Sequence, residues 1–145
     1  MKKMPPIEKI YEAFSAIADG RVKMQEKSAT VASSDRTKSY NVVWDEDTYR
    51  ASDSATYWQG YPGYPVIAVL MLQGRLPCNN ELVRIWAGIN WKQLNLKYKR
   101  NYAAAAMEVM EGFKAEGIDV DAMSEAASSI LKALGELNIT IGRTK

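Results

Sequence analysis

The chain of 145 residues carries 19 basic and 17 acidic side chains, and 47% of its residues are apolar. This length and this balance are typical of a soluble globular chain with about one domain. The sequence has no histidine and one cysteine, Cys78. These absences exclude Ser–His–Asp triads, Cys–His dyads, histidine-bound metals, cysteine-cluster zinc and intrachain disulfides. We therefore expect no metal, no cofactor and no enzymatic activity.

The charge is distributed unevenly along the chain. Residues 51–100 carry six basic and two acidic groups, whereas residues 101–145 carry four basic and seven acidic groups. Such an asymmetry marks a binding face in some proteins and arises by chance on a solvated surface in others. The start, MKKMPPIEKI, lacks the apolar stretch of a signal peptide, and the apolar run 66–72 is far shorter than the ~20 residues of a membrane span. We expect a cytoplasmic protein without membrane contact.

The first predicted element is a helix over residues 7–18. Apolar side chains such as Ile10 and Phe14 recur there at three- and four-residue spacing and share one face. Pro6 suits the first helical turn, and Gly20 suits the C-terminal stop.

A change of period then predicts strands. Residues 21–53 are richer in Ser, Thr, Val and Tyr, and Tyr40, Val42 and Trp44 lie on one side of a strand. We expect a three-stranded antiparallel meander. Its strands are predicted at 21–33, 37–44 and 48–53.

An aromatic segment and a short apolar helix follow the meander. Residues 54–64 read SATYWQGYPGY, and their glycines and Pro62 oppose regular structure. Pro65 at a first helical position and Gly74 just past the end predict a short buried helix between them.

The remaining sequence predicts further helices. Asn79 or Asn80 caps the first of them, and Asn90 with Gln93 resembles a capping box at the start of the next. That next helix continues, with a break, as far as Phe113.

A last helix is predicted after a turn at Gly117 and Ile118. Asp119 or Asp121 caps this helix. Its inner side carries Met123, Ala126, Ala127, Ile130, Leu134 and Leu137. Residues 138–145 are interpreted as a frayed end or a docking strand.

The order of helix, meander and helices predicts an α+β fold in a single domain, 1–145, rather than βαβ units. Its parts are an N-terminal helix (1–20), the meander with the short helix (21–74) and a helical half (75–145).

Residues 39–72 combine the predicted hairpin, the aromatic loop and the apolar helix. The hairpin is followed by Ser52-Asp53-Ser54-Ala55-Thr56-Tyr57, and Gly63-Tyr64-Pro65 opens the helix Val66-Ile67-Ala68-Val69-Leu70-Met71. This arrangement resembles the SWIM zinc finger, a ββα unit. In that family Cys-x-Cys-Pro-Asp-aromatic follows the hairpin, and Cys-x-His opens a short apolar helix. Tyr57 and the apolar helix match this pattern.

The four metal-ligand positions of this resemblance are occupied by Ser52, Ser54, Gly63 and Pro65. Glycine and proline offer no side-chain donor, and serine hydroxyls bind zinc poorly. We therefore interpret the segment as a zinc-free SWIM-like unit. The resemblance implies binding of nucleic acid or of other proteins, and no catalysis. The alternative is that hairpin, loop and helix form a common local arrangement reached independently.

The aromatic loop is one candidate contact site. Its rings are Tyr57, Trp58, Tyr61 and Tyr64. Aromatic, glycine-rich segments occur where peptides, polyproline segments or bases stack. The alternative is a folded-in loop whose rings belong to the core.

A basic segment, residues 92–102, is the other candidate contact site. It contains no acidic residue, and Trp91, Tyr98 and Tyr102 interleave with its cations. The cations are Lys92, Lys97, Lys99 and Arg100. Cations against phosphates and rings against bases are what a nucleic-acid groove requires. The alternative is a solvated helix start whose lysine stems cover apolar surface.

We therefore expect a small non-catalytic interaction module that contacts a protein or a nucleic acid through the aromatic loop and the basic segment. Self-association is a further expectation. The alternative is a small-ligand binder or an enzyme with a tyrosine-lined pocket and Lys or carboxylate acid–base groups. The interaction module predicts exposed aromatics beside lysines on a shallow face. The ligand binder predicts a closed cavity with a buried carboxylate or lysine whose pKa is shifted.

Overall fold

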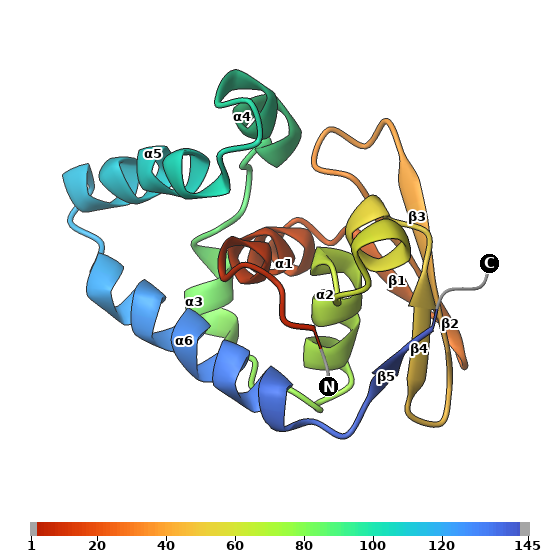
Figure 1. The fold of residues 1–145 in the computed structure, drawn as a ribbon. Helices are drawn as coiled ribbons and strands as arrows, with labels where there is room; N and C mark the ends of the chain where they lie inside the picture. Colours follow the sequence, from red (N-terminus) through yellow and green to blue (C-terminus); the bar gives the residue numbers. More distant parts are fainter. Residues whose placement is uncertain (1–2, 143–145) are drawn as a thin grey trace.

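The computed structural model describes residues 3–142 (Figure 1). An N-terminal helix, a sheet with a central helix, and a helical C-terminal half follow one another, so the fold is α+β as expected. The helices are α1 Glu8–Ala18, α2 Tyr64–Leu72, α3 Asn80–Arg84, α4 Trp91–Lys97, α5 Tyr102–Ala115 and α6 Val120–Glu136. The strands are β1 Val22–Met24, β2 Ser28–Ala32, β3 Ser39–Asp45, β4 Thr48–Ala51 and β5 Thr140–Ile141. A short π-helix, η1 Ala55–Gln59, follows β4.

Helix α2 lies at the centre of the fold. Every residue from Pro65 to Met71 is buried, because α1 packs against one side of the helix and strands of the sheet against the other (Figure 1). A helix covered from both sides has to be apolar all round. Pro65 in its first turn and Gly74 with φ +79° after its end confirm the predicted limits of this helix.

The sheet has five strands in the order β1-β2-β3-β4-β5, so the prediction of three strands is wrong. The segment 21–33, predicted as one strand, is the hairpin of β1 and β2, closed by a hydrogen bond from Gln25 N to Ser28 O (2.8 Å). Its turn, Gln-Glu-Lys, contains none of the usual turn residues and therefore gives no turn signal. β5 pairs with β4 in parallel, so of the two interpretations of the tail, a frayed end or a docking strand, Thr140–Ile141 follow the second. Residues 143–145 of that tail lie outside the described part of the chain.

The π-helix η1 corrects the expectation of irregular structure throughout 54–64. It occupies Ala55–Gln59 and ends at Gly60, which has φ +77°. Further on, a Cβ at Gly63 would collide with Asp53 Oδ2, so glycine is required where this backbone passes Asp53. π-Helices are rare and occur frequently at functional sites.

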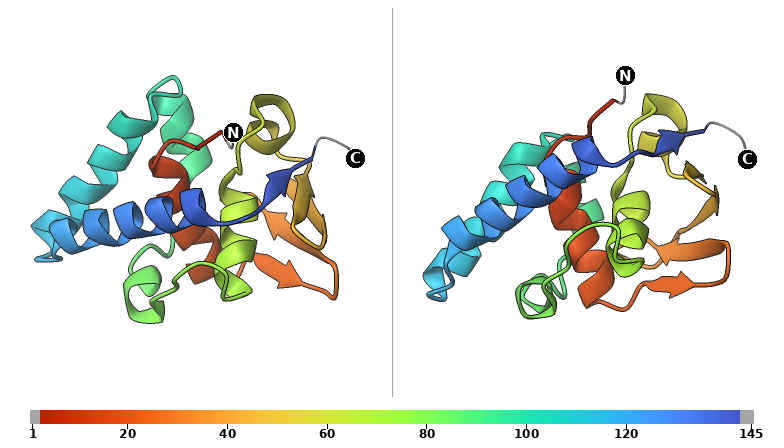
Figure 2. Two further views of the ribbon diagram at one scale, coloured as in Figure 1. Left: turned by 60° about the horizontal axis from the view of Figure 1, so that its bottom comes forward. Right: turned by 90° about the horizontal axis from the view of Figure 1, so that it is seen from below.

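The helical half is organised by side-chain caps. The side chains of Asn79, Asn90 and Asp119 accept hydrogen bonds from the first turns of α3, α4 and α6, which confirms these predicted caps. Asn101 caps α5 in the same way. The predicted break falls between α4 and α5. Figure 2 shows α6 running from its turn with α5 back across α1 towards the sheet.

An aromatic cluster around Trp86 joins the helical half to α1. The buried Trp86 ring stacks on Tyr11 of α1 (centroids 4.7 Å apart) and meets Phe113 of α5 edge to face (4.8 Å). Trp91 of α4 lies 6.2 Å from it. In the described part of the chain, no helix is long and apolar enough to cross a membrane.

Candidate functional site

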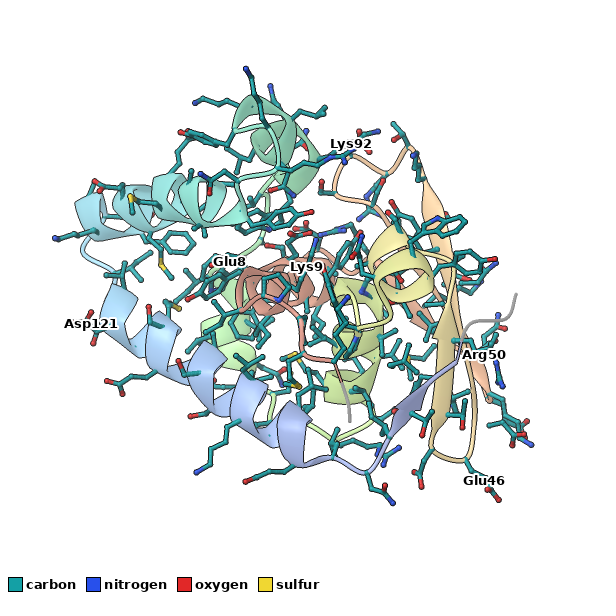
Figure 3. The ribbon with its side chains drawn as sticks, viewed as in Figure 1. Glu8, Lys9, Glu46, Arg50, Lys92 and Asp121 are labelled. Atoms are coloured by element: carbon teal, nitrogen blue, oxygen red, sulfur yellow. The ribbon has the colours of Figure 1, made fainter. Side chains whose placement is uncertain are left out.

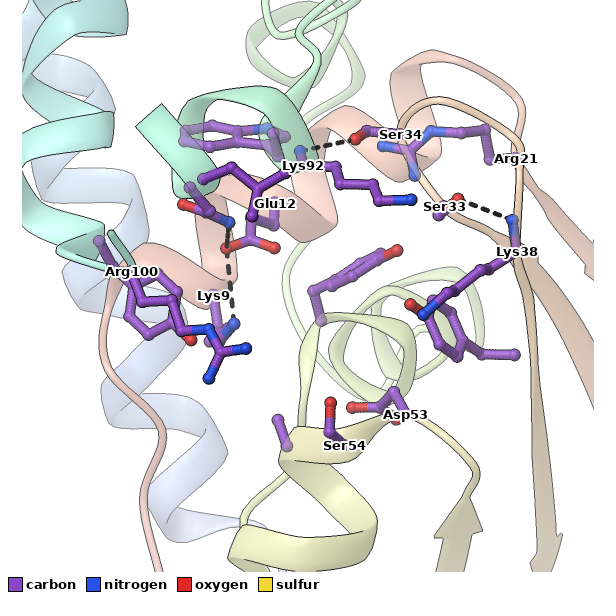
Figure 4. Close-up of a pocket in the computed structure, with 17 residues that line it drawn as sticks. Lys9, Glu12, Arg21, Ser33, Ser34, Lys38, Asp53, Ser54, Lys92 and Arg100 are labelled. Atoms are coloured by element: carbon purple, nitrogen blue, oxygen red, sulfur yellow. Dashed lines mark hydrogen bonds and ion pairs between the residues drawn. The ribbon is translucent and has the colours of Figure 1, made fainter. Parts of the chain in front are cut away.

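A polar cavity of about 250 Å³ lies between α1, the β2–β3 connection, the start of η1 and α4 (Figure 4). Five basic and two acidic side chains line it, so its walls carry a net positive charge. These are Lys9, Arg21, Lys38, Lys92 and Arg100 with Glu12 and Asp53. The aromatic residues of the lining are Tyr40, Tyr64, Trp91 and Tyr102.

Helix α1 supplies a buried ion pair to this cavity. Lys9 and Glu12 are three residues apart and therefore share a face of the helix, and they are only 8% and 5% exposed. Lys9 Nζ lies 3.6 Å from Glu12 Oε2 and 4.2 Å from the centre of the Tyr102 ring. Figure 3 shows Lys9 inside the fold, whereas Glu46 and Asp121 lie at its margin.

The pKa values of this pair reflect both burial and pairing. Burial by itself lowers the pKa of Lys9, but the Glu12 carboxylate and nearby tyrosine and Asp53 groups outweigh it, and the net shift is upward. Burial raises the pKa of Glu12, against the opposing effects of Lys9 and Asn95. The pair thus places a firmly charged cation beside a carboxyl group that binds its proton more readily than usual.

Asp53, at the other side of the cavity, is held by η1. It is 5% exposed, and its Oδ2 accepts hydrogen bonds from Thr56 N and Thr56 Oγ1, each 3.1 Å long. The Thr56 hydroxyl in turn accepts a bond from Gly63 N (2.9 Å). Asp53 Oδ1 has no partner among the described residues. Burial raises the pKa of Asp53, and the bonds from Thr56 oppose that shift.

The buried Arg21 and the half-buried Asn95 complete the floor of the cavity. Arg21 is 4% exposed and donates from Nη1 to Ala32 O (2.7 Å), while its Nη2 has no partner among the described residues. Asn95 Nδ2 donates to Glu12 Oε2 (3.5 Å), and its Oδ1 is also without a partner. Of the four buried side-chain polar atoms without a partner in residues 3–142, three therefore belong to residues that line this cavity.

The rim carries the more accessible cations. Lys92 Nζ contacts Asp35 Oδ2 (3.3 Å) and donates to Thr37 Oγ1 (3.1 Å). The exposed side chains of Lys38 and Arg100 form no hydrogen bond or ion pair with another described side chain. Arg100 has φ +67°, a left-handed backbone, and its N–H donates to Asn95 O (2.7 Å). Figure 4 shows these three cations extending from different sides of the cavity.

Two tyrosines add neutral hydroxyl groups. The Tyr40 and Tyr64 rings meet edge to face with centroids 6.3 Å apart. Burial raises the pKa of Tyr64 far above its usual range and also raises that of Tyr40. Both phenols therefore remain protonated at neutral pH.

Three of the predicted contact residues, Tyr64, Lys92 and Arg100, line this cavity. It lies between the aromatic loop and the basic segment, which the sequence predicted as one contact face. The role of the predicted residues as partner contacts stays a prediction.

The other predicted contact residues are scattered. Trp58 is 66% exposed and meets Tyr57 edge to face at 4.7 Å, and the half-buried Tyr61 lies 5.8 Å from Lys3 Nζ. Lys97 contacts Glu108 at 2.6 Å, and Lys99 is exposed with φ +54°.

The residues of the cavity floor are not among the predicted contact residues. Lys9 and Glu12 left one signal: they are a charged pair at i,i+3 within a helix that is otherwise apolar or small on most sides. Asp53 left another, because aspartate is a common capping residue at the start of a helical turn. Its Oδ2 accepts a hydrogen bond from the backbone N–H of Thr56, three residues later. Arg21 and Asn95 carried no local signal.

A second hollow, of about 550 Å³, lies over the outer face of the sheet. Its lining includes Thr30, Asn41, Ser52, Tyr57 and one charged side chain, Arg50. It lacks the buried ion pair of the polar cavity, and Arg50 Nε is the one buried polar atom without a partner among the described residues that belongs to its lining. No three Cys, Asp or Glu residues between residues 3 and 142 come together as a metal site.

Comparison with known proteins gives a match to a family model. The family model described as "Uncharacterised conserved protein UCP014422" matches residues 2–140. No curated protein and no solved structure matches the chain. The SWIM-like interpretation of residues 39–72 stays a prediction. Because the match spans almost the whole length, the chain belongs to the family of the uncharacterised conserved protein UCP014422.

Proposed function

We propose that the protein binds a small anionic molecule in the polar cavity and does not catalyse its conversion. We place this binding in the cytoplasm, because a lone thiol such as Cys78 stays reduced there. The observation that carries the proposal is the gathering of unpartnered buried polar atoms on Arg21, Asp53 and Asn95 around one cavity. Buried polar groups in folded proteins are almost always hydrogen-bonded. Three exceptions in one place indicate a site whose hydrogen bonds are completed by a bound molecule.

Charge and size restrict that molecule. With five basic and two acidic side chains, the cavity attracts anions, and its recessed walls concentrate the field. Its volume of about 250 Å³ lies just below the range of pockets for drug-sized ligands, which is roughly 300–1,000 Å³. The ligand is therefore a small metabolite rather than a dinucleotide or a peptide.

A titration with inorganic phosphate, followed by two-dimensional NMR of the indole N–H groups, tests the proposal. Trp91 lines the cavity, whereas Trp44 and Trp58 do not. We expect the Trp91 resonance to shift saturably and the resonances of Trp44 and Trp58 to stay in place. Absence of a saturable shift at Trp91 would contradict the proposal.

Variants localise the binding. Replacing both Lys38 and Arg100 by serine removes two rim cations and should weaken phosphate binding by at least about tenfold, as expected for lost bonds to charged groups. The matched control replaces Lys114 and Lys132, exposed cations outside the cavity lining, and should leave binding unchanged. Equal weakening in both double variants would show that phosphate responds only to overall charge, which rules the cavity out.

A second candidate function is the interaction module that the sequence predicts. The exposed ring of Trp58 beside Tyr57 supports it, since large exposed aromatics favour a partner. The partner is a protein or a nucleic acid, and self-association is a further option. Titration of labelled single-stranded nucleic acid across a salt series tests the nucleic-acid branch, and light scattering tests self-association. A Trp58→Ala variant should lose the binding of this partner and keep the shift of the Trp91 resonance on addition of phosphate.

A further inference from the structure

The geometry points to a phosphorylated polyhydroxy compound, such as a sugar phosphate, bound with its hydroxyl groups at the buried floor and its phosphate at the rim of the polar cavity. This inference rests on the proposed function and specifies the ligand of that site. It follows from the division of the lining into a buried floor and an exposed rim. Asp53 and Arg21 are nearly inaccessible, whereas Lys38 and Arg100 are exposed.

The floor requires a group that both donates and accepts. Asp53 Oδ1 and Asn95 Oδ1 are acceptors and Arg21 Nη2 is a donor without a partner among residues 3–142. A hydroxyl group can serve both kinds of partner, and neighbouring hydroxyls on one carbon chain can serve all three. An ammonium group suits the acceptors but would lie close to the cations of Lys9 and Arg21. A phosphate at the floor would meet the carboxylates of Asp53 and Glu12.

The rim provides what the floor does not. Two of the three hydrogens of the Lys92 ammonium face Asp35 and Thr37, and the third remains available. Lys38 and Arg100 have no side-chain partner among the described residues. Arginine matches phosphate oxygens with paired N–H groups, and lysine adds a point charge. The left-handed backbone at Arg100, a conformation unfavourable for a residue with a side chain, keeps this arginine at the cavity.

Calorimetric titration of the unmodified protein with a matched pair of ligands tests the inference. Ribose 5-phosphate and n-pentyl phosphate have the same number of carbons and the same phosphate, and differ in oxygen-bearing groups. We expect ribose 5-phosphate to bind at least about tenfold more tightly than n-pentyl phosphate and than inorganic phosphate, and ribose without phosphate to bind at least about tenfold more weakly.

The outcomes separate the two proposals. Equal affinity for ribose 5-phosphate and n-pentyl phosphate would overturn the role of the hydroxyls and leave the anion site standing. Equal affinity for ribose and ribose 5-phosphate would overturn the placement of phosphate at the rim. Failure of all four compounds to bind would remove the anion site as well.

A variant assigns the hydroxyl contact to the floor. Asp53→Asn has the same shape and can keep the bonds from Thr56 through its amide oxygen, but its second polar atom becomes an amide nitrogen, which donates where Asp53 Oδ1 accepts. We expect it to lower the affinity for ribose 5-phosphate by about tenfold or more, a loss that inorganic phosphate at the rim does not share. An unchanged affinity for ribose 5-phosphate in a folded variant would contradict the inference.

Discussion

The side chain of Asp53 depends on the missing side chain of Gly63. Asp53 is fixed by Thr56, and Thr56 is fixed by the N–H of Gly63, so the three residues form one hydrogen-bonded unit at the cavity floor. The unit is possible only because Gly63 has no side chain, since a Cβ there would collide with Asp53 Oδ2. A glycine of the aromatic loop thus shapes the site through its backbone N–H and through the absence of a side chain.

Gly63→Ala should therefore destabilise the protein by about 1–3 kcal/mol, the usual effect of overpacking a filled interior. It should also weaken the binding of ribose 5-phosphate, because the new methyl group displaces Asp53. Gly112→Ala is the matched control: Gly112 lies in α5 with open space around it, and alanine there should add roughly 0.5–1 kcal/mol of stability. Urea unfolding of both variants measures the difference. Equal stability of the two would contradict the packing described around Gly63.

At the level of elements, the turn between α4 and α5 changes the direction of the chain and also holds two residues in an unfavourable backbone conformation. Lys99 and Arg100 both adopt left-handed backbone conformations, with φ +54° and +67°. The turn is held on both sides, by the Arg100 N–H on Asn95 O and by Glu108, which accepts hydrogen bonds from Lys97 and Tyr98 at 2.6 Å each. The turn keeps two strained residues where glycine would be the usual choice.

Glycine at either position should relieve that strain and raise the free energy of unfolding by up to about 1 kcal/mol. The two variants should differ in binding. Arg100→Gly should weaken the binding of phosphate, because Arg100 lines the cavity. Lys99→Gly should bind phosphate as tightly as the unmodified protein does. Parallel unfolding and phosphate titrations compare them. Undiminished phosphate binding by the Arg100 variant would show that the strained backbone serves no ligand.

Elements with local signals could be predicted from the sequence, and those set by distant contacts could not. Pro65 with Gly74 delimited α2, and Asn79, Asn90 and Asp119 marked helix starts. The β1–β2 turn and the π-helix lack such signals. The floor of the site depends on α1, η1 and α4 coming together, and no spacing in the sequence encodes that approach. Of the predicted contact residues, only Tyr64, Lys92 and Arg100 line the cavity, and they belong to segments of biased composition.

On the scale of the whole molecule, one side chain connects most of the helices. Trp86 lies between Tyr11 of α1, Trp91 of α4 and Phe113 of α5, and its Nε1 donates to Met123 Sδ of α6 (3.4 Å). Trp91 donates in turn to the Ser15 hydroxyl (2.8 Å), so the wall of the cavity is continuous with this core. The position of α4 relative to α1, and with it the shape of the cavity, depends on this cluster.

Trp86→Ala should lower the free energy of unfolding by about 3–5 kcal/mol, a large part of the ~5–15 kcal/mol of a typical protein. The exposed Trp58 provides the control, since Trp58→Ala should change stability by no more than about 0.5 kcal/mol. Denaturant unfolding followed by circular dichroism measures both. Similar losses in the two variants would contradict the central place given to Trp86.

The sheet is finished at each side by a very short strand, the three-residue β1 and the two-residue β5. An unpaired strand edge is a template on which other chains can add, and short edges offer few groups for such growth. β5 is attached to β4 by few bonds, among them Thr140 N to Asp47 O (2.9 Å). Changes that detach β5 would uncover the longer edge of β4, and their earliest sign would be fibril formation or turbidity in concentrated solution rather than a loss of ligand.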